Sequence, residues 1–248
     1  MATYALVPGA DGSAWYWHRI VPGLRARGHQ VVTLDLPGEP TADLDAFADA
    51  ITDAIGEAVP DADAAGSTSP APGSGDDAGP LIVVAQSLGG FSAPLVCARR
   101  TVDRLVLVNA MVPRPGETAG EWWGNTGQAE ARAAHAASIG RRGADAEFDV
   151  RTDFFHDVPP GITDEAFAAE PGGPPAGIFA QPWPLARWPD VPTRFLQGRD
   201  DRFFPLDFQR RVVRDRLGPG VEVEELPGGH LVALSRPEEL LAALLRED

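Results

Sequence analysis

A serine between small residues is the first position in the sequence where we expect chemistry. Apolar residues 81–85 lead towards Ser87, and a helix-compatible run over residues 91–100 follows it. Ala85 and Gly89 stand two residues to either side of Ser87, where the crowded backbone of a tight turn admits little side chain. The spacing predicts a buried strand, a tight turn that exposes the serine hydroxyl, and a helix, which is how a nucleophilic serine is presented.

A histidine and two aspartates follow other predicted strands. His230 ends a Pro-Gly-Gly-His run, and Asp200 and Asp201 come shortly after a predicted strand at residues 193–197. A serine hydroxyl is a poor nucleophile until an imidazole accepts its proton, and the imidazole needs a carboxylate that fixes its tautomer. Because polar groups at the carboxyl ends of strands gather at one edge of an open α/β sheet, Ser87, His230 and one aspartate are expected to meet there.

The elements that would position these side chains alternate between strand and helix patterns. Short buried strands are predicted at residues 4–7, 31–34, 81–85, 104–108, 193–197 and 221–226, and helices at residues 15–27, 44–59, 91–100, 205–217 and 237–245. Such alternation is typical of an α/β fold with a mostly parallel six-stranded sheet covered by helices on both faces. We expect residues 1–248 to form one domain.

Two stretches interrupt the alternation. Residues 60–80 consist of Asp, Ala, Gly, Ser, Pro and Thr and cannot bury apolar surface, which predicts a flexible insertion remote from the chemistry. Residues 111–190 are rich in aromatic side chains and loops, with short helices expected at 128–139 and 163–169. An aromatic insertion of this kind after the fourth strand predicts a helical cap over the site.

Composition excludes several classes of function. The net charge of −15 opposes binding to phosphate backbones and anionic membranes, so neither nucleic acid nor membrane is an expected partner. All 21 basic residues are arginine, and the absence of lysine rules out Schiff-base, pyridoxal-lysine and P-loop chemistry. A single cysteine, Cys97, excludes an intrachain disulfide and is expected to be a buried small hydrophobe.

The sequence also predicts the location of the protein and its lack of bound groups. No stretch approaches the ~18 apolar residues of a membrane helix, and the N-terminus resembles no leader, so a cytoplasmic protein is expected. No His, Cys, Asp or Glu cluster has the spacing of a metal site, and we expect neither a metal nor a cofactor.

Together these motifs resemble the α/β-hydrolase superfamily over essentially the whole chain. The matching segments are Leu6-Val7-Pro8-Gly9-Ala10 with Ala14-Trp15, His29 through Asp35-Leu36-Pro37-Gly38, the turn at Ser87, Arg199-Asp200-Asp201-Arg202 with Pro205, and Gly228-Gly229-His230. The chain order of nucleophile, acid and histidine is also that of this superfamily. Within it, the chain is similar to the branch of plant methyl esterases and hydroxynitrile lyases, with the Ala-, Gly-, Pro- and Arg-rich composition of a bacterial member.

The resemblance implies roles for the polar residues. Ser87 would be the nucleophile, His230 the general base and acid, and Asp201 the acid that orients the imidazole. Asp201 is preferred over Asp200 because the family pattern places its aspartate three residues past a glycine and four before a proline. The alternative acid position, after the fourth strand, holds Asn109, which cannot carry a charge.

The resemblance also implies an oxyanion hole formed by the backbone N–H groups of Leu88 and Ala10. Pro8 departs from the family pattern, because relatives commonly have histidine at this position. The lyases of the branch use a lysine directly after the catalytic histidine and a threonine in the first loop. The chain has Leu231 and Gly9 at these positions, so cyanohydrin cleavage is not expected.

Loss of the lyase lysine leaves an apolar pocket suited to a neutral ester, thioester or lactone. The residues expected to line this pocket are Gly9, Trp122, Trp123, Phe155, His156 and Leu231. We therefore expect a serine hydrolase that acts on a small apolar carboxylic ester, as a monomer or homodimer. Two alternatives stay open: a lyase, cyclase or isomerase of secondary metabolism that uses the same site, and a ligand-binding protein with an idle triad.

Overall fold

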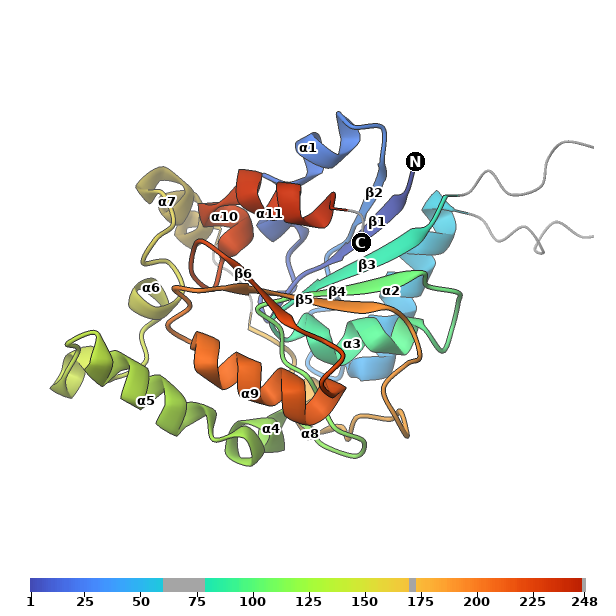
Figure 1. Ribbon diagram of the computed structural model, residues 1–248. Helices are drawn as coiled ribbons and strands as arrows, with labels where there is room; N and C mark the ends of the chain where they lie inside the picture. The colour runs from blue at the N-terminus through green and yellow to red at the C-terminus, as the bar shows by residue number, and fades with distance from the viewer. Residues whose placement is uncertain (60–78, 170–172, 247–248) are drawn as a thin grey trace, which may run out of the picture.

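Six strands form the centre of the molecule. The computed structural model describes residues 1–59, 79–169 and 173–246 (Figure 1). The strands are β1 (Thr3–Val7), β2 (Gln30–Thr33), β3 (Leu81–Gln86), β4 (Arg104–Val108), β5 (Thr193–Gly198) and β6 (Val223–Leu226). They pair in the order β2-β1-β3-β4-β5-β6, and every described pair is parallel. The prediction of a mostly parallel six-stranded sheet is confirmed.

Helices cover both faces of this sheet, as Figure 1 shows. One face packs against α2 (Leu44–Ala58), α3 (Gly89–Val96) and α9 (Leu206–Leu217). The other face packs against the 3₁₀ helix η1 (Ala14–Trp17) and against α1 (Val21–Arg25), α10 (Val232–Ser235) and α11 (Pro237–Leu244). Neighbouring strand residues point to opposite faces, so Val83 joins the first core cluster and Val84 the second.

Helix α2 shows how the sequence determines these elements. The Asp43 side chain accepts a hydrogen bond from the Ala46 N–H at 2.9 Å and caps the first turn. Phe47, Ile51 and Ile55 recur at helical spacing, and all are buried against the sheet. The helix predicted at residues 44–59 is confirmed.

The helix predicted at residues 15–27 is wrong as a single element. The structure has η1 and α1 instead, separated by a turn. Pro22 lies in the first turn of α1, where proline is tolerated because its missing N–H has no intrahelical acceptor to satisfy. Such a proline begins a helix, and a continuous helix would have lost a hydrogen bond there.

The chain between β4 and β5 forms a helical cap, which confirms the predicted insertion after the fourth strand. Its helices are α4 (Ala119–Thr126), α5 (Gln128–Ser138), the 3₁₀ helix η2 (Gly143–Ala146), α6 (Val150–Asp153), α7 (Pro160–Ala168) and α8 (Ala176–Ala180). Helices α5 and α7 were expected, whereas α4 lacks a clear apolar period. A capping box between Thr118 and Glu121 starts α4.

The base of the cap is fused to the core of the sheet. The buried indoles of Trp122 and Trp183 donate hydrogen bonds to the Val112 and Phe91 carbonyls, each at 3.0 Å. Glu117 forms a buried ion pair with Arg216 of α9, with 2.9 Å between Oε1 and Nη2. These contacts fix where the cap begins and ends relative to the strand ends.

Two predictions concern other parts of the chain. The flexible insertion predicted at 60–80 lies outside the described residues, apart from residues 79 and 80. Within the described ranges, the longest apolar helical stretch falls short of what is needed to cross a membrane.

Candidate active site

Ser87 lies at the turn between β3 and α3. Its φ angle is +50°, in the left-handed region that a non-glycine residue occupies only when surrounding structure holds it there. The Ser87 N–H donates to the Val108 carbonyl at 3.2 Å, and its own carbonyl accepts from the N–H groups of Gly90 and Met111 at 3.1 and 2.9 Å. The end of β4 and the residues after it therefore hold the backbone of Ser87 in this conformation.

Close backbone contacts explain the glycines after Ser87. A Cβ atom on Gly89 would lie 2.7 Å from the carbonyl oxygen of Pro8, and one on Gly90 would clash with the carbonyl oxygen of Met111. The small residue expected two positions after Ser87 is thus required by the approach of the first loop. This contact brings the loop after β1 against the start of α3.

The side chains of Ser87, His230 and Asp201 form a hydrogen-bonded chain. His230 Nε2 lies 3.2 Å from Ser87 Oγ, and His230 Nδ1 lies 2.8 Å from Asp201 Oδ2. The Asp201 carboxylate can only accept, so Nδ1 carries the proton and the free Nε2 faces the serine hydroxyl. All three residues are buried. The arrangement can move the serine proton onto an imidazole that a carboxylate orients.

Backbone N–H groups hold the Asp201 carboxylate in place. Its Oδ1 accepts from the N–H groups of Phe203 and Phe204, each at 2.8 Å, and Gln197 Nε2 donates to Oδ2 at 3.2 Å. Asp200, by contrast, is exposed and its carboxylate lies 3.7 Å from Arg199. Of the two neighbouring aspartates, Asp201 is the one that reaches the imidazole.

Asn109 joins the strand ends that carry the acid and the histidine. Its Nδ2 donates to the carbonyls of Gly229 and His230 at 3.0 and 2.8 Å, and its Oδ1 accepts from the Gly198 N–H at 2.7 Å. Asn109 is fully buried and has a φ angle of +46°. From the sequence, Asn109 was notable only as an amide at a position where some relatives have the acid. Its signal was a polar residue with αL tolerance at the end of a buried strand.

The expected oxyanion residues lie at the same edge of the sheet. Leu88 follows Ser87 at the start of α3, and Ala10 lies in the exposed loop after β1. Within the described residues, neither backbone N–H group donates to a protein acceptor. A Cβ atom on Gly9 would lie 3.1 Å from Ser87 Cβ and would clash with the Gln86 amide, so this loop passes directly beside Ser87.

Aromatic rings surround the imidazole. The Phe154 ring stacks on His230 with a centroid distance of 4.7 Å and an interplanar angle of 21°. The rings of Phe203 and Phe204 present edges to His230 at 5.4 and 5.2 Å. Trp123 is half-buried and contacts the Phe203 ring at 5.7 Å. The surroundings of the reactive side chains are therefore apolar.

The residues named for the pocket occupy different places. Gly9 lies beside Ser87, and Trp123 contacts Phe203, one of the rings that pack on the imidazole. Trp122 is fully buried in the core, and Phe155 packs on Phe167 at 5.1 Å beside the second core cluster. Half-buried Leu231 also packs on that cluster.

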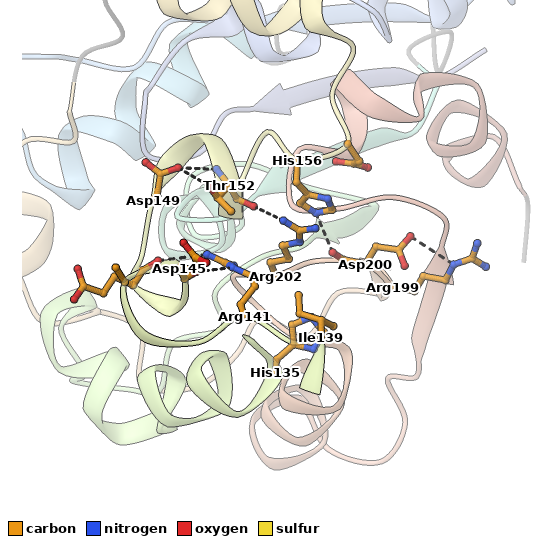
Figure 2. A pocket seen from close by; sticks show the side chains of 13 residues that line it. His135, Ile139, Arg141, Asp145, Asp149, Thr152, His156, Arg199, Asp200 and Arg202 are labelled. Atoms are coloured by element: carbon orange, nitrogen blue, oxygen red, sulfur yellow. Dashed lines mark hydrogen bonds and ion pairs between the residues drawn. The ribbon is translucent and has the colours of Figure 1, made fainter. Parts of the chain in front are cut away.

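His156 lines a polar cavity together with Asp200 and Arg202, the two neighbours of Asp201 in the chain (Figure 2). Its Nε2 lies 3.1 Å from the Asp200 carbonyl and therefore carries a proton. Burial lowers the pKa of His156 below the usual value, which keeps the ring neutral at pH 7. The cavity has a volume of about 820 Å³, and its lining includes neither Ser87 nor His230.

The same polar cavity contains many charged side chains. Its lining comprises His135, Ile139, Arg141, Ala144, Asp145, Glu147, Asp149, Thr152, His156, Asp157, Arg199, Asp200 and Arg202. Among the residues that the structure describes, no group of three or more His, Cys, Asp or Glu side chains is arranged to hold a metal ion.

Comparison with known proteins identifies the family. The profile of the Alpha/beta hydrolase family matches residues 5–244. The chain belongs to the α/β hydrolase family. This α/β-hydrolase is 28% identical to the "Probable esterase PIR7A" of Oryza sativa, with 98% of this chain and 95% of the relative covered. It is 27% identical to the "Pyrethroid hydrolase" of Sphingobium wenxiniae, with 96% and 85% covered.

Solved structures share the fold of this α/β-hydrolase. Polyneuridine aldehyde esterase superposes with a TM-score of 0.70 at 18% identity, covering 99% of this chain and 98% of its own. A methylesterase from Arabidopsis superposes with a TM-score of 0.68 at 19% identity and the same coverage. The α/β-hydrolase superfamily that the sequence motifs indicated is confirmed by the family profile, and a plant methylesterase is among the structures that share the fold.

Proposed function

We propose that this α/β-hydrolase cleaves small apolar carboxylic esters, thioesters or lactones through an acyl-enzyme on Ser87. The coarser class, a carboxylic ester hydrolase, follows from the family and from relatives that are named esterase and hydrolase. The observation that carries the proposal is the hydrogen-bonded chain from Ser87 Oγ through His230 to Asp201. In this chain the unprotonated Nε2 faces the serine hydroxyl, which suits removal of the serine proton.

The reaction proceeds in two halves. Ser87 Oγ attacks the ester carbonyl as its proton passes to His230 Nε2, and the imidazolium then gives that proton to the departing alkoxide. Water activated by the same nitrogen attacks the acyl-enzyme and releases the acid. The N–H groups of Leu88 and Ala10 stabilise the tetrahedral oxyanion, and one such donor is typically worth about 3–4 kcal/mol of transition-state stabilisation.

The preference for apolar substrates rests on the rings around His230. Phe154 and Phe203 supply half-buried aromatic surface beside the imidazole, and half-buried Trp123 extends this surface from Phe203. A substrate carboxylate here would lose its hydration without gaining a charged partner among these rings, and such desolvation is costly. Neutral acyl and alcohol groups meet no such penalty.

A panel of p-nitrophenyl esters tests the proposal. The acetate and butyrate are compared with the monosuccinate, which carries a carboxylate, and each is assayed with the wild type and Ser87→Ala. We expect kcat/KM for the neutral esters to exceed that for the monosuccinate by about tenfold or more, and Ser87→Ala to reduce kcat by a factor on the order of 10⁴ or more. Turnover by Ser87→Ala equal to that of the wild type would overturn the proposal. A wild type whose Ser87 is reactive but which does not hydrolyse these esters would favour non-hydrolytic chemistry.

A further inference from the structure

One short turn of the cap contacts both loops that carry the triad partners. This cap turn, residues 154–157, follows α6. It lies against the acid loop at residues 199–202 and against the glycines before His230 (Figure 2 shows the contact with the acid loop). The acid loop follows β5 and the glycines before His230 follow β6. The cap turn therefore contacts the ends of two neighbouring strands, which Asn109 and the Asp200 N–H to Gly228 carbonyl hydrogen bond also join.

Asp157 makes the cap turn's hydrogen bond to the backbone beside the catalytic histidine. Its Oδ2 accepts a hydrogen bond from the Gly229 N–H at 2.8 Å, one residue before His230. A Cβ atom on Gly229 would lie 2.8 Å from Asp157 Oδ1 and 2.6 Å from His156 Nε2, so the glycine leaves just enough room for the cap turn. Oδ1 is buried and has no hydrogen-bond partner among the described residues. Hence the contact with Gly229 is the bond that places this carboxylate.

The remaining contacts of the cap turn act on the same unit. Phe154 stacks on the imidazole of His230, and His156 donates to the Asp200 carbonyl at 3.1 Å. From the residue next to Asp201, Arg202 reaches back and donates to the Thr152 carbonyl of α6 at 2.9 Å. Ring stacking restrains the tilt of the imidazole, while the hydrogen bonds restrain the backbone of the acid loop and of Gly229.

We propose that Asp157 is a positioning residue of the triad, which holds His230 in line with Ser87 through the Gly229 N–H. The inference rests on the proposed function, because it concerns the same nucleophile. Reactive groups must be held in a near-attack geometry, and a misplacement of about 1 Å can reduce the rate by about 100-fold. Asp157 bonds to the Gly229 N–H and not to Ser87, so we expect its effect on the nucleophile to be transmitted through the position of His230.

Two substitutions separate positioning from other roles. Asp157→Ala removes the acceptor, whereas Asp157→Asn retains an oxygen for the Gly229 N–H and removes the charge. We expect Asp157→Ala to lower kcat about tenfold and Asp157→Asn to stay within about threefold of the wild type, with KM for p-nitrophenyl acetate changed less than about twofold in both. Asp164→Ala, an exposed carboxylate on α7 of the same cap, is the matched control and should match the wild type.

A readout independent of the substrate pocket is the rate of reaction with diisopropyl fluorophosphate. Its second-order rate constant should fall about tenfold in Asp157→Ala, in step with kcat, and recover in Asp157→Asn. A wild-type rate in Asp157→Ala would overturn the inference and leave the proposed function intact. Failure of the wild type to react would overturn the proposed function, and the inference with it.

Gly229→Ala keeps the test decisive if Asp157→Ala does not fold, as judged by circular dichroism. This variant retains the carboxylate and displaces it, because the new Cβ occupies the space of His156 Nε2 and Asp157 Oδ1. We expect about a tenfold loss of reactivity, and a double variant with Asp157→Asn no slower than Gly229→Ala alone. Wild-type reactivity of Gly229→Ala would refute the positioning role.

Discussion

Replacement of Asn109 by leucine should damage both stability and catalysis. The side chain of Asn109 is fully buried and makes hydrogen bonds to Gly198 N–H and to the carbonyls of Gly229 and His230. Leucine of similar size makes none of them. The His230 carbonyl retains a long contact of 3.4 Å from Gln86 Nε2, so the groups left without a partner are the Gly198 N–H and the Gly229 carbonyl.

The magnitude follows from these contacts. Each orphaned buried group costs about 1–3 kcal/mol, and leucine at the φ angle of +46° costs about 1–2 kcal/mol more. Asn109→Leu should therefore lower the free energy of unfolding by about 3–8 kcal/mol. Domains are typically stable by only about 5–15 kcal/mol, so the upper part of this range would leave little folded protein.

Urea unfolding followed by tryptophan fluorescence measures the change, with kcat/KM on a p-nitrophenyl ester measured in parallel. Asn125→Leu is a matched control, because Asn125 is exposed and its amide makes one bond, to Glu117 Oε1 at 2.9 Å. The control should cost about 1 kcal/mol or less. A loss of under about 1 kcal/mol for Asn109→Leu, equal to that of Asn125→Leu, would refute the structural role assigned to Asn109.

Four further outcomes are expected. Glu117→Ala should lower the free energy of unfolding by about 3–5 kcal/mol because it leaves buried Arg216 without its carboxylate partner. Asp207→Ala, at an exposed ion pair, should lower it by under about 1 kcal/mol. Similar losses for the two variants in urea unfolding would contradict this. Burial opposes ionisation of Glu117, but the hydrogen bonds from Arg216 and Asn125 hold its pKa below the usual value. The stability that ionised Glu117 contributes is therefore present at neutral pH and is lost as the pH falls through that lowered pKa. An acid-unfolding curve unchanged by Glu117→Gln would count against this pH dependence. Gly90→Ala should prevent folding, because the new Cβ would clash with the Met111 carbonyl. Gly124→Ala, with open space around its position in α4, should be neutral or stabilising by up to about 1 kcal/mol in thermal unfolding. Normal stability of Gly90→Ala would contradict the tight packing behind Ser87. Burial raises the pKa of the Cys97 thiol to about 11, so iodoacetamide at pH 8 should label the folded protein far more slowly than the urea-unfolded chain; equal rates would show that the thiol is accessible and ionised.

Local patterns account for what could be predicted from the sequence. Apolar runs such as residues 81–85 mark strands wherever they end in turn residues, and Ser87 between small residues marks the turn after β3. Helix α2 was predictable because its cap and its apolar spacing are both local. The resemblance of the motif order then placed Asp201 and His230 at neighbouring strand ends, where the structure brings them within hydrogen-bond distance.

Tertiary contacts account for what could not be predicted. Phe154 and Phe155 are adjacent and chemically identical, yet one stacks on His230 and the other packs on Phe167. In α4 the fully buried neighbour is Trp122, and Trp123 is the half-buried one. Short helices joined by irregular turns have no period from which the facing direction of one residue can be read.

Asn109 illustrates the same limit for a polar side chain. The sequence shows an amide at the end of a strand, but not that three backbone groups from β5 and the histidine loop converge on it. Asp157 is similar, because its partner Gly229 lies 72 residues away in the chain. Both residues support the triad through the backbone, and backbone partners leave no trace in residue type.

The most direct test of the account is covalent labelling of the nucleophile. The folded wild type is incubated with a fluorophosphonate probe, and the adduct is located by intact mass and peptide mapping, with Ser87→Ala alongside. We predict a single adduct on Ser87, none on Ser87→Ala, and much slower labelling of His230→Ala because the imidazole no longer accepts the serine proton. No adduct on folded wild type, or an adduct on another residue, would contradict the assignment of Ser87 as the nucleophile.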